Sequence, residues 1–251
     1  MPGNRAVRMV SLVGLIALVA PLAFSQENTT SVPPPYRGVS EQVDGVFVTP
    51  VANVPFSATA ELESVQVLPD GSSTAKKTIN NIARDSAGRI YNERRRLVPF
   101  SFTGTPQLTR FHIYDPDTRL NTFLDPATHL AHQSVFTNPA AQLLASAAQV
   151  NSRGHHGEDL GNDVMENVAV HGTRTSRTIS AQSSGTGQPV VITDEYWYSD
   201  ELHLNMLVKH DDPRTGQQTV TVTHVTRAEP SEALFQVPSG YRVVDETPVS
   251  Q

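Results

Sequence analysis

The segment 190–227 constrains the fold more than any other part of this chain. Apolar and polar residues alternate over much of 203–209 and throughout 219–223. A period of two is typical of β-strands that bury one face and expose the other. Between the last two apolar stretches, Pro213 suits the second position of a turn and Gly216 supplies a positive φ. The segment therefore predicts three antiparallel strands in a meander.

More strands are predicted upstream, each bounded by turn-forming residues such as Asp, Gly and Pro. The six predicted strands cover 56–68, 73–84, 89–98, 108–114, 119–124 and 128–133. Downstream of them, the polar and glycine-containing segment 151–162 predicts a mobile loop, and 163–179 returns to strand character. The segment 181–189 reads as a Ser/Gly loop. A helical turn with an apolar anchor is predicted over 229–235.

One convincing helix is predicted, over 138–150. Asn138 is a natural N-cap, Pro139 fits the first helical position, and alanines and leucines follow. Apolar residues surround most of this helix, which indicates that it is enclosed. It either plugs the concave side of a curved sheet, which we favour, or packs as an ordinary core helix on a flat one. The predicted fold class is mainly β with one or two helices: a strongly curved antiparallel sheet, or half-barrel, with a helix plugging its concave face.

The N-terminal residues predict export. Arg5 and Arg8 precede an apolar run over 9–20, and small residues follow at the positions that a signal peptidase requires. We interpret 1–25 as a cleaved signal peptide, with an uncleaved anchor as the alternative, and expect a periplasmic or extracellular protein. The predicted organisation is then a proline-rich extended leader over 26–54, a single β-rich domain over 55–246 and a tail over 247–251. The leader is alternatively a docking strand that covers a sheet edge.

Composition excludes several classes of function. The chain has no cysteine, so it has no disulfide framework, no thiolate nucleophile and no lipid-anchored cysteine. The net charge of −6 gives no general attraction to nucleic acid or to an anionic membrane. The sequence also lacks a G-x-S-x-G elbow, a P-loop and a G-x-G-x-x-G fingerprint. We therefore predict a protein that is not an enzyme and has no cofactor.

Histidines invite a metal hypothesis that their spacing does not support. His155 and His156 lie in a loop without helical spacing, and His129 and His132 are three apart, so on a strand they point to opposite faces. We therefore predict no metal site. Three more histidines, His203, His210 and His224, fall in the segment 190–227, where we expect ordinary sheet or surface histidines.

Candidate ligand-binding residues are apolar side chains of the predicted concave face. The only aromatic cluster is 196–198, in which alternation places Tyr196 and Tyr198 on one face and Trp197 on the other. Plain sheet packing is the alternative explanation for this cluster. The candidate set is Phe56, Leu62, Leu143, Leu144, Tyr196, Trp197 and Met206.

Several sequence runs carry a family resemblance over 55–244. They are P-F-S-A-T-A-E-L-E-S-V-Q-V-L-P-D-G, R-D-S-A-G-R, E-Y-W-Y-S-D-E-L, H-D-D-P-R-T-G and R-A-E-P-S-E-A-L-F-Q-V-P-S-G-Y, and they resemble a group of secreted bacterial proteins. The strand order and closing L-F-x-V-P element are similar to the lipoprotein-carrier superfamily of LolA, LolB and RseB-like proteins. The resemblance implies an incomplete, highly curved barrel lined with apolar side chains and closed by helices. It carries over no residue position by position.

These observations predict an exported, non-enzymatic protein that holds a lipid-like or acyl group in the concave apolar face of a curved sheet. Its expected partner is a hydrophobic ligand or a lipoprotein acyl chain, with no nucleic acid and no stable membrane span after signal cleavage. The alternative is an RseB-like envelope-sensing protein that docks a membrane-bound regulator. An envelope hydrolase is the third hypothesis, and it requires clustered carboxylates or histidines in a cleft.

Overall fold

The structure, a computed structural model, describes residues 46, 48–68, 70–135 and 157–247. The predicted signal peptide, most of the predicted leader and the predicted helix at 138–150 lie outside the described residues. Within the described part of the chain, no helix is long and apolar enough to cross a membrane.

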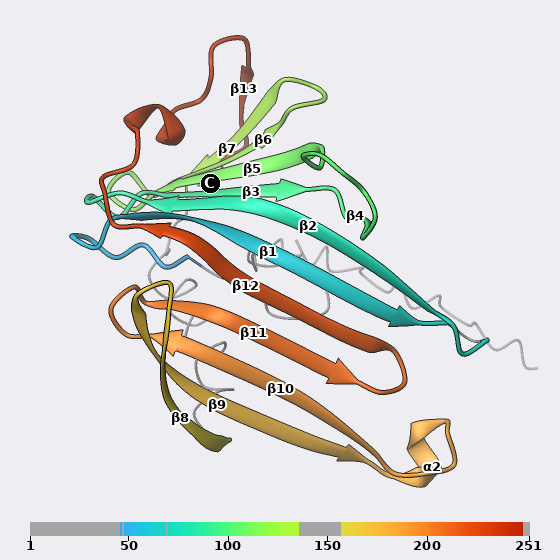
Figure 1. Ribbon diagram of the computed structural model, residues 1–251. Coiled ribbons are helices and arrows are strands. Elements are labelled where there is room, and N and C mark those ends of the chain that lie inside the picture. The colour runs from blue at the N-terminus through green and yellow to red at the C-terminus, as the bar shows by residue number, and fades with distance from the viewer. Residues whose placement is uncertain (1–45, 47, 69, 136–156, 248–251) are drawn as a thin grey trace, which may run out of the picture. The chain divides into compact units, whose positions relative to one another are not determined.

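Thirteen strands form one sheet (Figure 1). The first seven are β1 (Phe56–Val67), β2 (Ser73–Arg84), β3 (Ile90–Arg95), β4 (Val98–Pro99), β5 (Leu108–Asp115), β6 (Leu120–Asp125) and β7 (Leu130–Val135). The later strands are β8 (Glu158–Met165), β9 (Val168–Ile179), β10 (Val190–Ser199), β11 (Leu204–Asp212), β12 (Gly216–Thr226) and β13 (Arg242–Asp245). Two single helical turns, α2 (Ala181–Ser184) and η1 (Glu232–Phe235), lie between the later strands. The predicted meander over 190–227 is confirmed as β10, β11 and β12.

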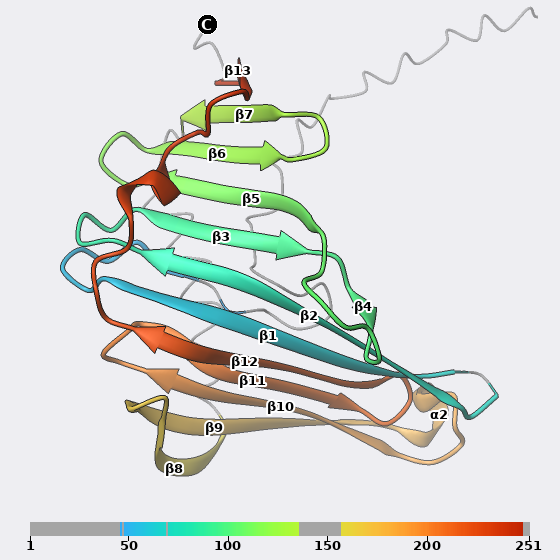
Figure 2. The ribbon, with the colours of Figure 1, turned by 45° about the horizontal axis from the view of Figure 1, so that its top comes forward.

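The spatial order of the strands divides the sheet into two meanders. The order is β13-β7-β6-β5-β3-β2-β1-β12-β11-β10-β9-β8, with β4 paired to β2 beside this path (Figure 2). The described pairs are antiparallel except β13 with β7, which is parallel. The strands from β1 to β7 form one meander and those from β8 to β12 form the other. Pairing of β1 with β12 joins them along a seam, where Leu62 lies beside Val220.

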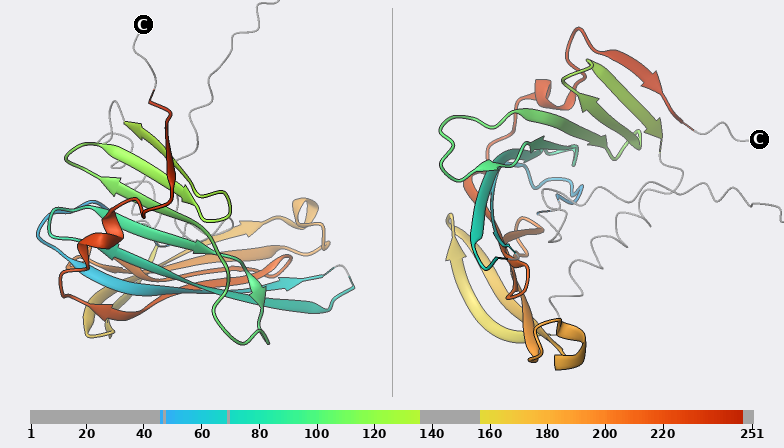
Figure 3. Two further views of the ribbon diagram at one scale, coloured as in Figure 1. Left: turned by 90° about the horizontal axis from the view of Figure 1, so that it is seen from above. Right: turned by 90° about the vertical axis from the view of Figure 1, so that its right-hand side faces the viewer.

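The sheet is open and strongly curved, which confirms the half-barrel prediction (Figure 3). Segment 48–54 lies on the concave side, which we call the inner face, and η1 lies on the convex side, which we call the outer face. Each face has its own buried cluster. The inner cluster contains residues such as Phe56, Leu204 and Met206, and the outer one contains residues such as Phe111 and Phe235.

Alternation along β1 explains why the inner face is buried. Phe56, Ala58, Ala60 and Leu62 are buried, whereas the residues between them are partly exposed. A strand places every second side chain on the same face, so these four point to the concave side together. The predicted first hairpin of β1 and β2 is confirmed by continuous antiparallel pairing along both strands.

The turn between β11 and β12 also follows the prediction. The N–H of Thr215 donates to the carbonyl of Asp212 at 3.0 Å, which places Pro213 at the second turn position. Gly216 has φ of +119°, and a Cβ there would approach the carbonyl oxygen of Val65 to 1.9 Å. Only glycine fits this position, because both the backbone angle and the neighbouring strand exclude a side chain.

Two predictions around residue 160 are wrong. The described part of the predicted loop 151–162 contains most of β8, and the predicted strand 163–179 is interrupted by a tight turn. β8 pairs with β9 despite its polar sequence, because Gly161, with φ of +82°, takes up a register shift. At the turn, Glu166 and Asn167 both have positive φ, as a two-residue hairpin turn requires.

Smaller features of the second half also differ from expectation or agree with it. The predicted loop 181–189 contains the single helical turn α2. The helical turn predicted over 229–235 is confirmed as η1, whose Phe235 is buried against the outer face. The apolar patch of the predicted leader contributes Val46 and Val48, which are buried in the inner cluster. The packed core therefore includes residues that precede Pro55.

Candidate functional site

A row of apolar side chains crosses four neighbouring strands on the inner face. Leu62 of β1 lies beside Val220 of β12, Val220 beside Val208 of β11, and Val208 beside Tyr196 of β10. All four side chains are buried. Their row crosses the seam between the two meanders without a polar interruption. We call this row and its buried neighbours on β1 and β9 to β12 the apolar floor.

Four of the seven predicted ligand-binding residues meet in this floor. Phe56, Leu62, Tyr196 and Met206 all belong to the inner cluster. They come from β1, β10 and β11, and the curvature and register of the sheet bring them to one surface. Leu143 and Leu144 lie outside the described residues.

Trp197 occupies a different position from the other described candidates. It borders the inner cluster, but alternation along β10 gives it the same face as Glu195. Its Nε1–H donates to Oε1 of Glu195 at 2.8 Å. Its ring packs on Gly172 of β9, where a Cβ would come within 2.8 Å of the indole. Trp197 therefore has a partner for its polar atom and a fitted place on the sheet.

A row of polar side chains borders the apolar floor on the same face. We call it the polar stripe: Thr78 and Asn80 of β2, Asn92 of β3, His112 of β5 and Asn121 of β6. All five are buried. Register places Thr78 beside Leu62 of the floor and Asn92 beside His112. At the level of Leu62 the inner face thus changes from apolar to polar over one step from β1 to β2, whereas Ile82 of β2 and Ile90 of β3 belong to the inner cluster.

Three atoms of the polar stripe have no hydrogen-bond partner among the described residues. They are Oγ1 of Thr78, Nδ2 of Asn80 and Oδ1 of Asn92. The other amide atom of Asn80, Oδ1, accepts from the N–H of Arg95 at 2.7 Å. A buried polar atom without a partner costs about 1–3 kcal/mol. Three in one patch are therefore a costly arrangement unless a molecule completes their hydrogen bonds.

His112 keeps the polar stripe uncharged at neutral pH. Burial lowers the pKa of His112 to about 4, against the opposing effect of its hydrogen bond to Asn121. That bond joins Nε2 of His112 to Oδ1 of Asn121. The imidazole stacks on Phe123 with ring centroids 4.6 Å apart. The other stripe residues are neutral amides and a hydroxyl, so the whole stripe offers hydrogen bonds without a net charge.

A buried arginine at the end of β2 holds segment 48–54 against the inner face. Arg84 is fully buried and donates from Nε to the carbonyl of Val54 at 2.8 Å. It also donates from Nη1 to the carbonyl of Thr49 at 2.8 Å and from Nη2 to that of Leu202 at 2.9 Å. Its guanidinium lies 5.0 Å from the ring centroid of Phe56. Burial lowers the pKa of Arg84 to about 10, so the clamp remains cationic at neutral pH.

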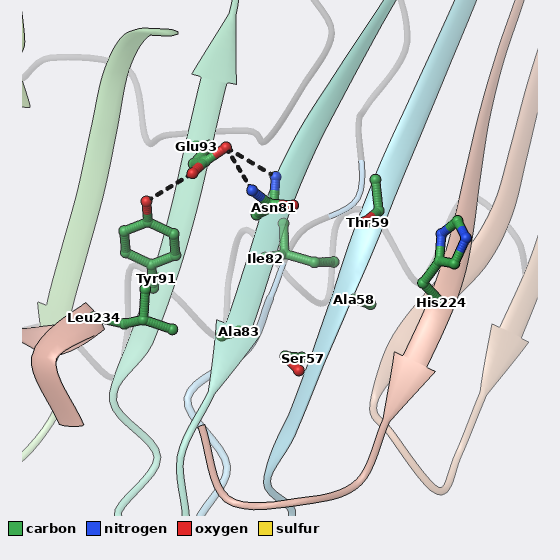
Figure 4. A pocket seen from close by; sticks show the side chains of 10 residues that line it. All are labelled: Ser57, Ala58, Thr59, Asn81, Ile82, Ala83, Tyr91, Glu93, His224 and Leu234. Atoms are coloured by element: carbon green, nitrogen blue, oxygen red, sulfur yellow. Dashed lines mark hydrogen bonds between the residues drawn. The ribbon is translucent and has the colours of Figure 1, made fainter. Parts of the chain in front are cut away.

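A small pocket lies on the outer face, where Glu93 forms a dense network (Figure 4). The pocket has a volume of about 290 Å³. Glu93 accepts from the hydroxyl of Tyr91 at 2.9 Å, from Nδ2 of Asn81 at 3.0 Å and from Nε of Arg95 at 2.8 Å. Burial and the adjacent Glu93 raise the pKa of Tyr91, so its phenol stays protonated and donates. The network is complete within the protein, and we interpret it as structural.

The histidines of the described residues serve separate local roles. His210 lies 2.6 Å from the carboxylate of Asp194, His132 lies 2.6 Å from that of Glu246, and His224 lines the outer pocket. Within the described ranges, no group of three or more His, Asp or Glu side chains has the arrangement of a metal site. His155 and His156 fall outside those ranges.

Sequence reasoning missed the polar stripe and the Arg84 clamp. A signal was present, since Thr78, Asn80, Ile82 and Arg84 share one face of β2 by simple alternation. Polar residues on a strand normally indicate the solvent-exposed face. The sequence of β2 gives no sign that this face is the concave one.

Comparison with known proteins gives similarity in structure alone. No family model matches the chain, and no curated protein matches it in sequence. An uncharacterised conserved protein from Thermus thermophilus is 11% identical, with a TM-score of 0.40 over 77% of this chain and 91% of that one. MucB in the Pseudomonas aeruginosa MucA/MucB complex is 12% identical, with a TM-score of 0.40 over 76% of this chain and 58% of that one.

A third similar structure is a putative outer membrane lipoprotein-sorting protein domain from Vibrio parahaemolyticus. It is 8% identical, with a TM-score of 0.27 over 71% of this chain and 88% of that chain. Identities and TM-scores this low do not indicate what the present chain binds.

Proposed function

We propose that this protein is an exported, non-enzymatic binding protein that holds an acyl chain or a similar lipid-like group on its inner face. The observation that supports this most is the apolar row from Leu62 through Val220 and Val208 to Tyr196. An acyl chain needs no specific polar group, because burial of apolar surface contributes about 25 cal/mol per Å². The predicted signal peptide supports the location.

Binding on this face is an exchange of contacts. The side chains of the floor are already shielded from water, so an entering chain replaces protein atoms that cover them. Segment 48–54, held by Arg84, is part of that cover, since Val48 and Val54 pack in or against the inner cluster. The net affinity is therefore smaller than the contact area alone suggests.

The first test is native mass spectrometry of the mature protein purified without detergent, followed by organic extraction and lipid analysis. We expect a stoichiometric bound lipid. A clean apo mass, with no later uptake of a fluorescent fatty acid, would contradict the proposal and move the search to protein partners.

Two alanines on adjacent strands provide a matched pair of variants. Ala60 of β1 is buried in the inner cluster, and Ala83 of β2 is buried in the outer one. Extra methyl groups in either core cost about 1–3 kcal/mol, so both variants should lose similar stability. Ala60→Leu should lower fatty-acid uptake several-fold, because the larger side chain occupies space over the apolar floor that the acyl chain would fill. Ala83→Leu should leave uptake unchanged. Equal loss of uptake in both variants would indicate general damage, and loss only in Ala83→Leu would move the site to the outer pocket.

A further inference from the structure

Three unpartnered polar atoms meet on one side of the apolar floor. Thr78 and Asn80 lie two residues apart on β2, so their side chains point to the same face. Asn92 pairs with Ile82, the next inner-face residue of β2, and is therefore a diagonal neighbour of Asn80. All three side chains are at least nine-tenths buried. The patch presents one N–H donor, one carbonyl acceptor and one hydroxyl that can do either.

This patch lies directly beside the floor. Leu62 pairs with Thr78 on one side and with Val220 on the other, and Ala60 pairs with Asn80 and with Val222. A molecule that lies across these strands meets apolar side chains on β1 and β12 and hydrogen-bonding groups on β2 and β3. An apolar surface beside a hydrogen-bonding one is complementary to an amphiphile whose acyl chain lies on the apolar floor and whose head group lies on the polar stripe.

We propose that the polar stripe binds the uncharged, hydroxyl-bearing head group of an amphiphilic ligand, of the acylglycerol type. This inference rests on the proposed acyl-chain function and names its ligand class. A hydroxyl both donates and accepts, so one hydroxyl of a glycerol head can accept from Nδ2 of Asn80 and donate to Oδ1 of Asn92, and the other can bond Oγ1 of Thr78. A methyl ester offers acceptors alone and leaves the Asn92 oxygen without a partner.

The charges around the stripe favour a neutral head over a carboxylate. No stripe residue is charged at neutral pH, and an unpaired carboxylate is expensive to bury. Arg84, on the same face of β2, already donates to three backbone carbonyls. Arg94 and Arg110 lie one step further along β3 and β5, where the side chains are no longer fully buried. A carboxylate bound at the stripe itself would face the Asn92 oxygen, because the nearest cationic side chains of this face, Lys76 of β2 and Arg94 of β3, lie outside the buried patch.

The test compares three ligands with the same twelve-carbon chain: glycerol monolaurate, methyl laurate and laurate. Affinity for the delipidated full chain is measured by calorimetry below the micelle concentration of each ligand. We expect wild-type protein to bind glycerol monolaurate about tenfold more tightly than either of the others, the equivalent of one well-placed buried hydrogen bond. Thr78→Val and Asn92→Leu should each bring this preference to within about twofold, with affinity for methyl laurate unchanged.

Thr122→Val is the matched control. Thr122 is also a buried threonine, but its cross-strand partner is Ile113 of the outer cluster, and its hydroxyl accepts from Gln133 at 3.2 Å. This variant should keep the full preference for glycerol monolaurate. Melting temperatures of Thr78→Val and Asn92→Leu should equal or exceed that of wild type, since each replaces an unpartnered polar atom by an apolar group. If the melting temperature of Asn92→Leu is below that of wild type, the ligand preference of Thr78→Val decides the test, because that change replaces only a hydroxyl by a methyl group.

The outcomes separate the two proposals. Equal binding of all three ligands, or tightest binding of laurate, would overturn the head-group assignment and leave the acyl-chain function standing. A preference that survives in both stripe variants would also overturn it. No binding of any ligand by wild type would overturn both.

Discussion

Buried polar residues on the two faces of β2 and β3 differ in whether their hydrogen bonds are complete. On the outer face, Glu93 accepts hydrogen bonds from Tyr91, Asn81 and Arg95. On the inner face, the neighbouring residue Asn92 has a carbonyl oxygen without a described partner. Both side chains are buried, and they differ by one position in one strand.

This difference separates two reasons for burying a polar group. A network whose members complete one another stabilises the fold, and its removal leaves charges and donors without partners. A buried group without a partner destabilises the free protein, so a binding role gives a reason for its presence. Whether the buried polar atoms have hydrogen-bond partners therefore distinguishes these two sites better than their burial does. Substitutions at Glu93, Asn92, Arg84 and His112 test the comparison.

Glu93→Leu should have the largest effect on stability. It leaves Arg95 and the Tyr91 hydroxyl without their acceptor, and breaking a buried ion pair from one side costs about 4 kcal/mol. Asn92→Leu, the adjacent change on the inner face, removes an oxygen without a described partner and should leave the free energy of unfolding equal to or above that of wild type. Urea denaturation of both variants gives the two values. Similar losses in both would remove the distinction between the faces.

Arg84→Met should have the next largest effect on stability, because Arg84 is an inner-face residue whose guanidinium donates to three carbonyls. The change leaves the carbonyls of Thr49, Val54 and Leu202 without their donor. We expect a loss of about 3 kcal/mol in the free energy of unfolding. Arg84→Lys keeps the charge but cannot reach three carbonyls with a planar fork, so it should recover only part of the loss. Full stability of Arg84→Met would show that the clamp contributes nothing to the fold.

His112 should give a smaller, pH-dependent effect. Burial lowers its pKa from 6.5 to about 4 in the folded protein, so below pH 6.5 the unfolded chain binds a proton that the folded chain does not. Stability should therefore fall as pH falls, by about 2 kcal/mol between pH 7.5 and 5 from this group. His112→Gln should remove that part of the slope in urea denaturation series. An unchanged slope would indicate that the stripe is hydrated and that His112 titrates normally.

The sequence predicted the strands of this fold well and their faces only in part. Alternation and turn residues located β1, β2 and the meander of β10 to β12, because period and turn chemistry are local properties. The strand β8 was missed, since its polar residues pair through a register shift at Gly161 that no alternation reveals.

The candidate site was predictable only on its apolar side. Phe56, Leu62, Tyr196 and Met206 follow from the rule that large apolar residues on strands are buried. Thr78, Asn80 and Asn92 do not follow from any such rule, because their burial depends on the curvature of the sheet and on pairing with distant strands. Such pairing is a tertiary property, and the local sequence of β2 is the same whether its Thr78 face is wet or enclosed.

The seam between β1 and β12 would link the proposed ligand binding to the last steps of folding. Each meander can form from neighbouring hairpins, but the seam joins Leu62 to Val220 across more than half of the chain. Contacts so distant in sequence form slowly, because a large loop must close before they are made. A molecule that lies across the seam finds its surface only in the fully assembled sheet, and by mass action it favours that state. On the proposed function, a chain whose two halves have not yet joined would thus be unable to bind its ligand.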